Sequence, residues 1–287
     1  MIGLVAFDLD GTVLSTLNQA SLVSVKTIQK LVEKGIWIAS VSGRNMENSQ
    51  APFSALPDLA SAMFIGCYNG AVVLDLAVDG QRRILWEERV PELEFQEIME
   101  YIGFKQLNFV YCKCDVREKG IKEAYITDRE TESVQKLELM TGVRVVFDED
   151  LLPRIGKGEF SRPPKLIVMS GKDSRDSTFE EMQEIFGGRL YLARTGEDRI
   201  EIMHKKSNKG MALRVIALAC EVPLEEVLAV GDGDNDLPML QEAGLGVLVE
   251  SSDEVTLKVA QETGVRIGPT FEAEGFSDAV HRYVLDV

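Results

Sequence analysis

Three aspartates lie within six residues in the sequence GDGDND, namely Asp232, Asp234 and Asp236. Carboxylates this close together each need a cation, a proton or open water nearby. A calcium loop of the EF-hand kind also spaces its acids at alternate positions, but it requires glycine at its sixth position and glutamate at its twelfth. Leu237 and Ala243 stand there instead. The spacing therefore favours a magnesium or phosphate site over a calcium loop.

A second group of acids, the pair Asp8 and Asp10, lies in the sequence FDLDGT. Residues two apart on a strand point to the same side, so both carboxylates start on one side of the chain. Two such groups cannot both ionise easily unless a cation joins them. Their mutual repulsion therefore pushes their pKa values apart. One ionised carboxylate can then attack as a nucleophile while the other donates a proton. Gly11 allows the chain to turn away tightly after them.

Both groups of acids follow continuous apolar runs, which are typical of strands buried on both faces. The run IGLVAF precedes Asp8, and VLAV precedes the GDGDND sequence. Further strands are expected at IWIASV (36–41) and LGVLV (245–249), with a helix over 20–34. Strand, helix and strand with short links predict a parallel sheet with right-handed crossovers. Such sheets bind their ligands beyond the carboxyl ends of the strands, where these acids lie.

The pattern changes near residue 80. From there the chain alternates half-exposed strands, such as ILWEERV, with amphipathic helices, such as ELEFQEIMEYIGF at 92–104. Continuous buried runs return from about residue 198. The sequence therefore predicts an α/β protein. Its doubly wound parallel, Rossmann-like core is expected over 1–82 and 192–287, with an inserted α+β domain over 83–191.

The chain of 287 residues carries 31 Lys and Arg against 47 Asp and Glu, a formal net charge of −16. Such a chain repels nucleic-acid phosphates and anionic membrane surfaces. The N-terminal run MIGLVAF is too short for a signal peptide, and no apolar run approaches the roughly twenty residues of a membrane span. The four cysteines are scattered, which favours reduced thiols. We therefore expect a cytoplasmic protein that binds no nucleic acid and no membrane.

Four motifs stand at or just after expected core elements: FDLDGT (7–12), SGR (42–44), SNKG (207–210) and GDGDND (231–236). Their order and settings resemble those of the haloacid dehalogenase superfamily of phosphohydrolases. The similarity is closest to the Cof-type, sugar-phosphatase-like branch, whose members carry a large insert between the second and third motifs. The sequences NG at 69–70, LPMLQEAG at 237–244 and EGFSDAV also look like that branch. The resemblance implies that the insert is a cap domain that closes over the substrate.

The resemblance also implies a role for each acid and for one lysine. Asp8 would be the nucleophile and form an aspartyl phosphate, while Asp10 would protonate the leaving alkoxide and then activate water. Lys209 would neutralise the phosphate and hold Asp8 ionised. A Mg²⁺ ion would be bound by Asp8, the backbone carbonyl of Asp10 and Asp232, with Asp236 supporting the metal site.

Other positions that match the family pattern would contact the phosphoryl group or the rest of the substrate. These residues are Thr12, Ser42, Gly43, Arg44, Asn69 and Asn235. Arg44 and Asn69 have an alternative role, because residues at the ends of loops also cap turns.

The sequence thus predicts a Mg²⁺-dependent phosphatase that hydrolyses small phosphorylated metabolites, such as sugar phosphates, through an aspartyl phosphate. Two alternatives remain open. A phosphotransferase or sugar phosphomutase on the same core would pass the phosphoryl group to a sugar instead of water. A non-catalytic metabolite-binding protein would keep the fold without turnover. A nucleotide-binding oxidoreductase is disfavoured, because no G-x-G-x-x-G sequence follows the first strand.

Overall fold

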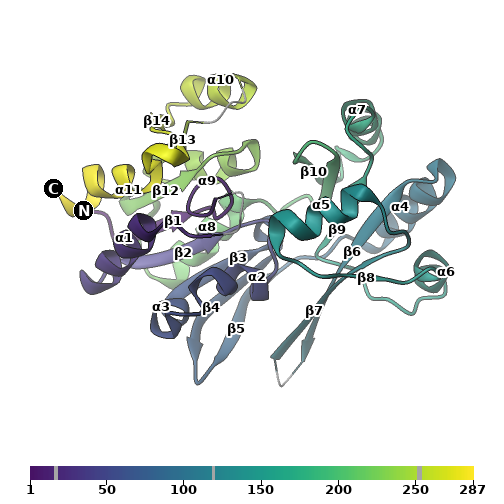
Figure 1. Cartoon of the computed structure of the whole chain (residues 1–287), viewed down its shortest axis with the longest axis horizontal. Helices are drawn as coiled ribbons and strands as arrows, with labels where there is room; N and C mark the ends of the chain where they lie inside the picture. Colours follow the sequence, from purple (N-terminus) through teal and green to yellow (C-terminus); the bar gives the residue numbers. More distant parts are fainter. Residues whose placement is uncertain (16–18, 118–119, 251–253) are drawn as a thin grey trace. The chain divides into compact units, whose positions relative to one another are not determined.

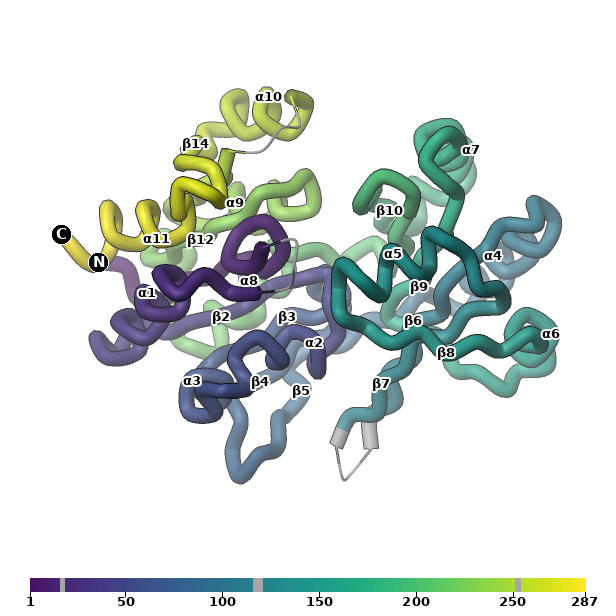
Figure 2. Tube along the Cα trace, in the orientation of Figure 1, coloured from purple at the N-terminus to yellow at the C-terminus, as the bar shows by residue number. Residues whose placement is uncertain are grey.

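The computed structural model of the protein describes residues 1–15, 19–117, 120–250 and 254–287. The chain divides into two compact units, of which the first comprises Met1–Trp86 and Asn208–Val287 and the second comprises Glu87–Ser207. In Figure 2 the purple N-terminal and yellow C-terminal segments lie in the same unit, whereas the teal middle of the chain forms the other. The second unit is therefore an insertion into the first.

An eight-stranded sheet lies at the centre of the first unit, with the strand order β14-β13-β12-β1-β2-β3-β4-β5 (Figure 1). Strand β1 pairs in parallel with both β12 and β2, and the outer pairs β2–β3, β12–β13 and β13–β14 are parallel as well. Strand β4 runs antiparallel to β3. The strands are β1 (Leu4–Phe7), β2 (Trp37–Val41), β3 (Met63–Cys67), β4 (Val72–Val78), β5 (Gln81–Glu87), β12 (Val227–Gly231), β13 (Leu245–Val249) and β14 (Arg266–Gly268).

Helices pack on both faces of this sheet, because successive strand residues point to opposite sides. Leu4 and Ala6 share one apolar cluster with helices α8, α9 and α10, whereas Val5 and Phe7 share a second cluster with α1, α3 and α11. The helices are α1 (Leu22–Glu33), α2 (Met46–Gln50), α3 (Pro57–Ser61), α8 (Lys209–Ala219), α9 (Leu237–Glu242), α10 (Glu254–Glu262) and α11 (Gly275–Val280). The predicted α/β class with a doubly wound parallel core is confirmed.

The second unit contains a six-stranded sheet with the order β10-β11-β9-β6-β7-β8. Its pairs are antiparallel except for β7 and β8, which are parallel. The strands are β6 (Asn108–Arg117), β7 (Gly120–Thr127), β8 (Val145–Phe147), β9 (Lys165–Met169), β10 (Leu190–Thr195) and β11 (Arg199–His204). The helices are α4 (Glu92–Lys105), α5 (Glu132–Thr141), α6 (Leu151–Gly156) and α7 (Arg175–Phe186). Apolar side chains of α4, α6 and α7 share one core with this sheet.

The structure places β11, and part of β5, in a different unit from the one that the sequence predicts. The sequence pattern places residues from 192 onward in the core, but β11 pairs with β9 and β10 in the six-stranded sheet. A strand that is buried on both faces has the same pattern in either sheet, so hydrophobicity does not assign it to one of them. At the first boundary, β5 extends the eight-stranded sheet to Glu87, although residues from 83 onward are expected in the insert. None of the helices that the structure describes is long and apolar enough to span a bilayer.

Candidate active site

Asp8 and Asp232 lie beyond the carboxyl ends of two neighbouring parallel strands. Asp8 follows β1 and Asp232 follows β12, with Phe7 opposite Val230 in the register of the pair. The Asp8 N–H donates a hydrogen bond to the Val230 carbonyl oxygen at 2.9 Å, which continues the pairing up to the acid. The sheet therefore brings together two carboxylates from opposite ends of the chain.

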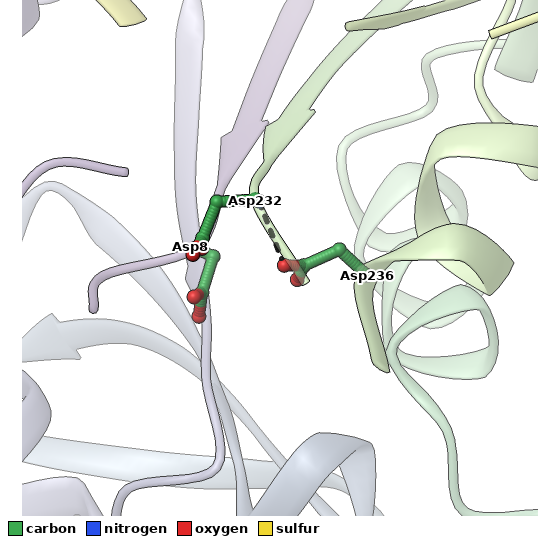
Figure 3. Close-up of side chains that lie close together, drawn as sticks. All are labelled: Asp8, Asp232 and Asp236. Carbon is green, nitrogen blue, oxygen red and sulfur yellow. Dashed lines mark hydrogen bonds between the residues drawn. The ribbon is translucent and has the colours of Figure 1, made fainter. Parts of the chain in front are cut away.

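Three carboxylates converge at this edge of the sheet. One oxygen atom from each of Asp8, Asp232 and Asp236 lies within 4.8 Å of the others. In Figure 3 the side chains of Asp8 and Asp232 lie close together, and the Asp236 side chain approaches them from the turn before α9. Asp8 and Asp236 are only 5% and 0% exposed. Hard divalent cations prefer oxygen donors, so these three residues, called here the acidic triad, fit a metal such as Mg²⁺.

The single-turn helix η4 (Asp234–Asp236) fixes the third acid of the triad. Asp236 Oδ2 accepts hydrogen bonds from the backbone N–H groups of Asp232, at 3.0 Å, and Gly233, at 2.9 Å. The first of these bonds is the dashed line in Figure 3. Because Oδ2 closes the loop, Asp236 shapes the GDGDND turn, and its Oδ1 contacts the Lys209 ammonium group.

Lys209 places a buried ammonium group against two of these acids. It is the first residue of α8, and the Asn208 side chain caps that helix by accepting from the Met211 N–H at 2.9 Å. Lys209 Nζ lies 2.7 Å from Asp8 Oδ1 and 2.6 Å from Asp236 Oδ1. Burial lowers the pKa of this lysine, but the two carboxylates outweigh burial and raise its pKa above the ordinary value. The ammonium group therefore stays charged beside Asp8.

Two acids of the triad, Asp8 and Asp232, have raised pKa values. Burial raises the pKa of Asp8 well above its usual value, and the Lys209 charge opposes this shift. Burial, followed by the neighbouring Asp236 carboxylate, raises the pKa of Asp232 to about 7. Thr12 Oγ1 donates a hydrogen bond to Asp232 Oδ1 at 3.1 Å, which favours the charged form. A divalent cation would supply the positive charge that lets these carboxylates ionise.

Gly11 lets the chain pass directly beside Asp232. Its φ angle is +79°, in the region that favours glycine. A Cβ atom added at Gly11 would overlap Asp232 Oδ2. The glycine of FDLDGT therefore permits the tight turn that the sequence predicts and also a close approach to an acid of a distant motif.

The Asp10 carboxylate is bound by Arg44. Arg44 Nε donates a hydrogen bond to Asp10 Oδ2 at 2.8 Å, and Arg44 Nη2 forms an ion pair with Asp10 Oδ1. The Arg44 side chain is buried, whereas the Asp10 side chain is 46% exposed. The guanidinium group thus holds a carboxylate that solvent can still reach. The sequence names both residues as site candidates but gives no signal of this pairing, because it depends on how the loops after β1 and β2 approach one another.

The predicted SGR residues lie at the end of the next strand. Ser42 and Gly43 follow β2, and the Ser42 N–H donates to the Gly66 carbonyl oxygen at 2.9 Å. Ser42 Oγ accepts a hydrogen bond from the Arg44 N–H at 3.2 Å. These contacts hold the loop close to the end of β3.

Asn69 and Asn235 meet between two further loops of the first unit. Asn69 lies in the short turn η2 (Tyr68–Gly70) after β3, and Asn235 lies in η4. Asn235 Nδ2 donates a hydrogen bond to Asn69 Oδ1 at 3.2 Å. Each predicted site residue thus follows β1, β2, β3 or β12, or begins α8.

The family model for haloacid dehalogenase-like hydrolases matches residues 5–268 of the chain. The chain belongs to this family. The phosphatase YwpJ of Bacillus subtilis strain 168 is 25% identical over 278 residues, covering 90% of this chain and 92% of the relative. The HMP-PP phosphatase of Escherichia coli strain 55989 is 24% identical over 250 residues, covering 87% of this chain and 84% of the relative. A solved haloacid dehalogenase-like hydrolase from B. subtilis has a TM-score of 0.81 at 20% identity, covering 99% and 100% of the two chains.

Membership of the haloacid dehalogenase-like hydrolases confirms the resemblance that FDLDGT, SGR, SNKG and GDGDND indicate. The match extends from β1 to the end of β14, so it spans both parts of the first unit and the insert between them. The similarity to the solved structure likewise covers the whole fold.

Proposed function

We propose that this hydrolase is a Mg²⁺-dependent phosphatase that acts on small phosphorylated metabolites, sugar phosphates or similar compounds. The observation that carries the proposal is the buried Lys209 ammonium 2.7 Å from Asp8 Oδ1, beside the rest of the acidic triad. Phosphoryl transfer needs a nucleophile in line with the leaving group and positive charge around the phosphate oxygens. Asp8 is placed to serve as that nucleophile and Lys209 supplies positive charge beside it, and the names of the two curated relatives support the same reaction class.

Asp8 is the nucleophile in this proposal. Its carboxylate oxygen forms a bond to phosphorus while the bond between phosphorus and the ester oxygen of the substrate breaks, which leaves an aspartyl phosphate. Lys209 holds the carboxylate charged and adds positive charge beside the transferring group. Asp8, the backbone carbonyl of Asp10, Asp232 and Asp236 would hold Mg²⁺, which supplies countercharge to the phosphoryl oxygens when bound.

Asp10 is the general acid and base. It gives its proton to the leaving alkoxide in the first half of the reaction. In the second half it takes a proton from the water that attacks the aspartyl phosphate, so that inorganic phosphate leaves and Asp8 is restored. The buried Arg44 guanidinium fixes the direction of the Asp10 carboxylate.

The remaining predicted residues bind the phosphoryl group in this proposal. Ser42, Gly43, Thr12 and Asn235 offer hydroxyl, backbone N–H and amide donors to its oxygens. The second unit, Glu87–Ser207, is the cap domain, which excludes water and supplies contacts to the rest of the substrate. The net charge of −16 supports a protein that binds no nucleic acid.

A panel of phosphorylated metabolites, including hexose, pentose and erythrose phosphates, pyridoxal phosphate and flavin mononucleotide, tests the proposal. We expect release of inorganic phosphate from some members with Mg²⁺ and none after chelation with EDTA. The Asp8→Asn protein is the matched control, since it keeps the size of the side chain and loses the nucleophile.

Two outcomes would contradict the proposal. Absence of phosphate release from the whole panel and from a generic aryl phosphate would favour a binding protein. Transfer of the phosphoryl group to an organic acceptor, detected by product analysis, would favour a phosphotransferase or a sugar phosphomutase.

A further inference from the structure

The turn η2 (Tyr68–Gly70) has an unusual backbone. All three residues have positive φ angles, 51° for Tyr68, 55° for Asn69 and 91° for Gly70. Glycine adopts such angles freely and asparagine tolerates them, whereas a bulky aromatic residue there is a clear outlier. Tyr68 and Asn69 are 0% and 1% exposed, so the surrounding structure holds the turn in this form. Outliers of this kind cluster at functional sites.

Backbone hydrogen bonds fasten this turn to the SGR loop. The Tyr68 N–H donates to the Arg44 carbonyl oxygen, and the Asn69 N–H donates to the Ser42 carbonyl oxygen, both at 2.9 Å. The two donors are consecutive, so the left-handed conformation aims both of them at one neighbouring loop. The turn is therefore held by the loop that carries Arg44, the partner of Asp10.

The other side of the turn lies against the start of α8. A Cβ atom added at Gly70 would overlap the Asn208 carbonyl oxygen, so only glycine fits there without a shift of the backbone. Asn208 is the residue that caps α8 immediately before Lys209. The turn is thus held between the loop after β2 and the helix that presents the buried lysine.

The Asn69 side chain reaches a third motif. Its Oδ1 accepts the hydrogen bond from Asn235 Nδ2 at 3.2 Å. Asn235 lies between Asp232 and Asp236, two members of the acidic triad, in the single turn that links them. A contact that fixes Asn235 also restricts the loop that carries both carboxylates, and loops that are fixed before binding lose less entropy when they bind a ligand.

We propose that Asn69 is a positioning residue that acts through Asn235 to hold the GDGDND loop in the form that binds the divalent cation. The inference rests on the proposed function, because it concerns the same site. Asn69 is then neither a substrate ligand nor a simple turn cap, which are the roles that the sequence suggests for it. Its loss weakens metal binding and lowers kcat, while KM for the substrate stays nearly constant.

The variant Asn69→Gly tests this role, because glycine accepts the positive φ angle and lacks the acceptor oxygen. We expect the Kd for Mg²⁺, measured by calorimetry, to rise about tenfold, equivalent to the loss of one ordinary hydrogen bond. With p-nitrophenyl phosphate at fixed Mg²⁺, kcat falls by a similar factor and KM changes less than about twofold. Asp79→Gly is the matched control, since Asp79 has a φ angle of 51° in an exposed turn and the substitution leaves both quantities unchanged.

A double-mutant cycle with Asn235→Ala separates action through Asn235 from an independent effect. If Asn69 acts through Asn235, each single variant weakens Mg²⁺ binding and the double variant is little worse than either. Additive losses, or a rise in KM with unchanged Mg²⁺ affinity, would overturn the assignment. If thermal melting shows that Asn69→Gly does not fold, Asn235→Ala alone decides, because it breaks the same hydrogen bond and an unchanged Mg²⁺ affinity contradicts the proposal.

The calorimetric titration needs no turnover, so it distinguishes the two proposals. Wild-type protein that binds no Mg²⁺ contradicts the proposed function together with this inference. Wild-type protein that binds Mg²⁺ as tightly as both variants contradicts this inference alone.

Discussion

Lys209 Nζ lies 2.7 Å from Asp8 Oδ1, and both side chains are buried. The contact joins the end of β1 to the first residue of α8, so it connects the two sequence segments of the first unit at the site. Burial alone would favour a neutral Asp8, whereas the adjacent ammonium favours the carboxylate. Lys209 therefore opposes the effect of burial on the Asp8 carboxylate, in a place where water does not stabilise its charge.

Replacing Asp8 by asparagine should abolish turnover. The amide keeps the shape of the side chain but cannot form the aspartyl phosphate, so we expect phosphate release to fall by about a thousandfold or more. The measurement is inorganic phosphate released from the best substrate of the panel. Asp234→Asn, in the GDGDND loop but outside the acidic triad, should keep activity within about twofold. Substantial turnover by Asp8→Asn would exclude the covalent mechanism.

Replacing Lys209 by methionine should destabilise the metal-free protein. The change leaves Asp8 and Asp236 buried without their common cation. Loss of one partner of a buried ion pair costs about 3–5 kcal/mol. Urea unfolding in EDTA measures the change in the free energy of unfolding. The double variant Lys209→Met/Asp236→Asn should recover part of the loss, because it removes one of the unpaired charges. Equal stability of Lys209→Met and the wild type would show that Lys209 forms no stabilising ion pair with Asp8 or Asp236.

The acids and the lysine of the site could be predicted because each lies at a boundary that the sequence marks. Asp8 and Asp232 follow continuous apolar runs, which indicate parallel strands buried on both faces. Parallel neighbours present their carboxyl ends at one edge of a sheet, so the convergence of these acids follows from strand order alone. Lys209 follows Asn208, a typical helix-capping residue, and that places it at the start of α8.

The contacts between loops and between distant strands could not be predicted in this way. The pairing of Arg44 with Asp10 and the three positive φ angles at Tyr68–Gly70 depend on how separate loops pack. In the second unit, Lys165 of β9 and Glu201 of β11 form a buried ion pair at 2.6 Å. These residues become neighbours only through the strand order of the six-stranded sheet, which hydrophobic periodicity does not reveal. For the same reason the sequence pattern places β11 in the core, although β11 pairs with β9 and β10 in the six-stranded sheet.

The metal-free protein should lose stability as the pH rises from about 4 to 7. The pKa of Asp232 is raised from 3.8 to about 7 in the folded state, and that of Asp8 is raised as well. Between those values the folded state binds more protons than the unfolded state, so the free energy of unfolding falls with increasing pH. Urea unfolding in EDTA at pH 5, 6 and 7 measures this slope, and Asp232→Asn should reduce it. Stability that increases over this range would contradict the raised pKa values.

Magnesium binding should show the opposite dependence on pH. The ion requires ionised carboxylates, so it competes with the proton that Asp232 retains below a pKa of about 7. As the pH rises toward that pKa, we expect the Kd for Mg²⁺ to fall about tenfold per pH unit for each proton displaced. Above that pKa the Kd should level off. Calorimetric titrations at pH 5.5, 6.5 and 7.5 measure the effect. A Kd that is constant over this range would show that Asp232 is already ionised without the metal.

Gly11→Ala should impair the site through a clash with Asp232 as well as through backbone strain. Alanine at a positive φ angle costs about 1–2 kcal/mol by itself. At Gly11, where φ is +79°, the added methyl group would also overlap Asp232 Oδ2 and displace an acid of the triad. Gly35→Ala is the matched control, because Gly35 has a φ angle of +73° and the described part of the chain, its two sequence neighbours aside, places no atom within 4 Å of the added Cβ.

Both alanine variants should therefore lose a similar amount of stability from the backbone, whereas only Gly11→Ala should bind Mg²⁺ more weakly, by about tenfold or more. Urea unfolding measures the first quantity and calorimetric titration the second. If Gly35→Ala weakened Mg²⁺ binding as much as Gly11→Ala, the effect would come from general destabilisation and the contact between Gly11 and Asp232 would carry no role in the site. If neither variant bound Mg²⁺ more weakly, Asp232 would not need its present position to hold the ion.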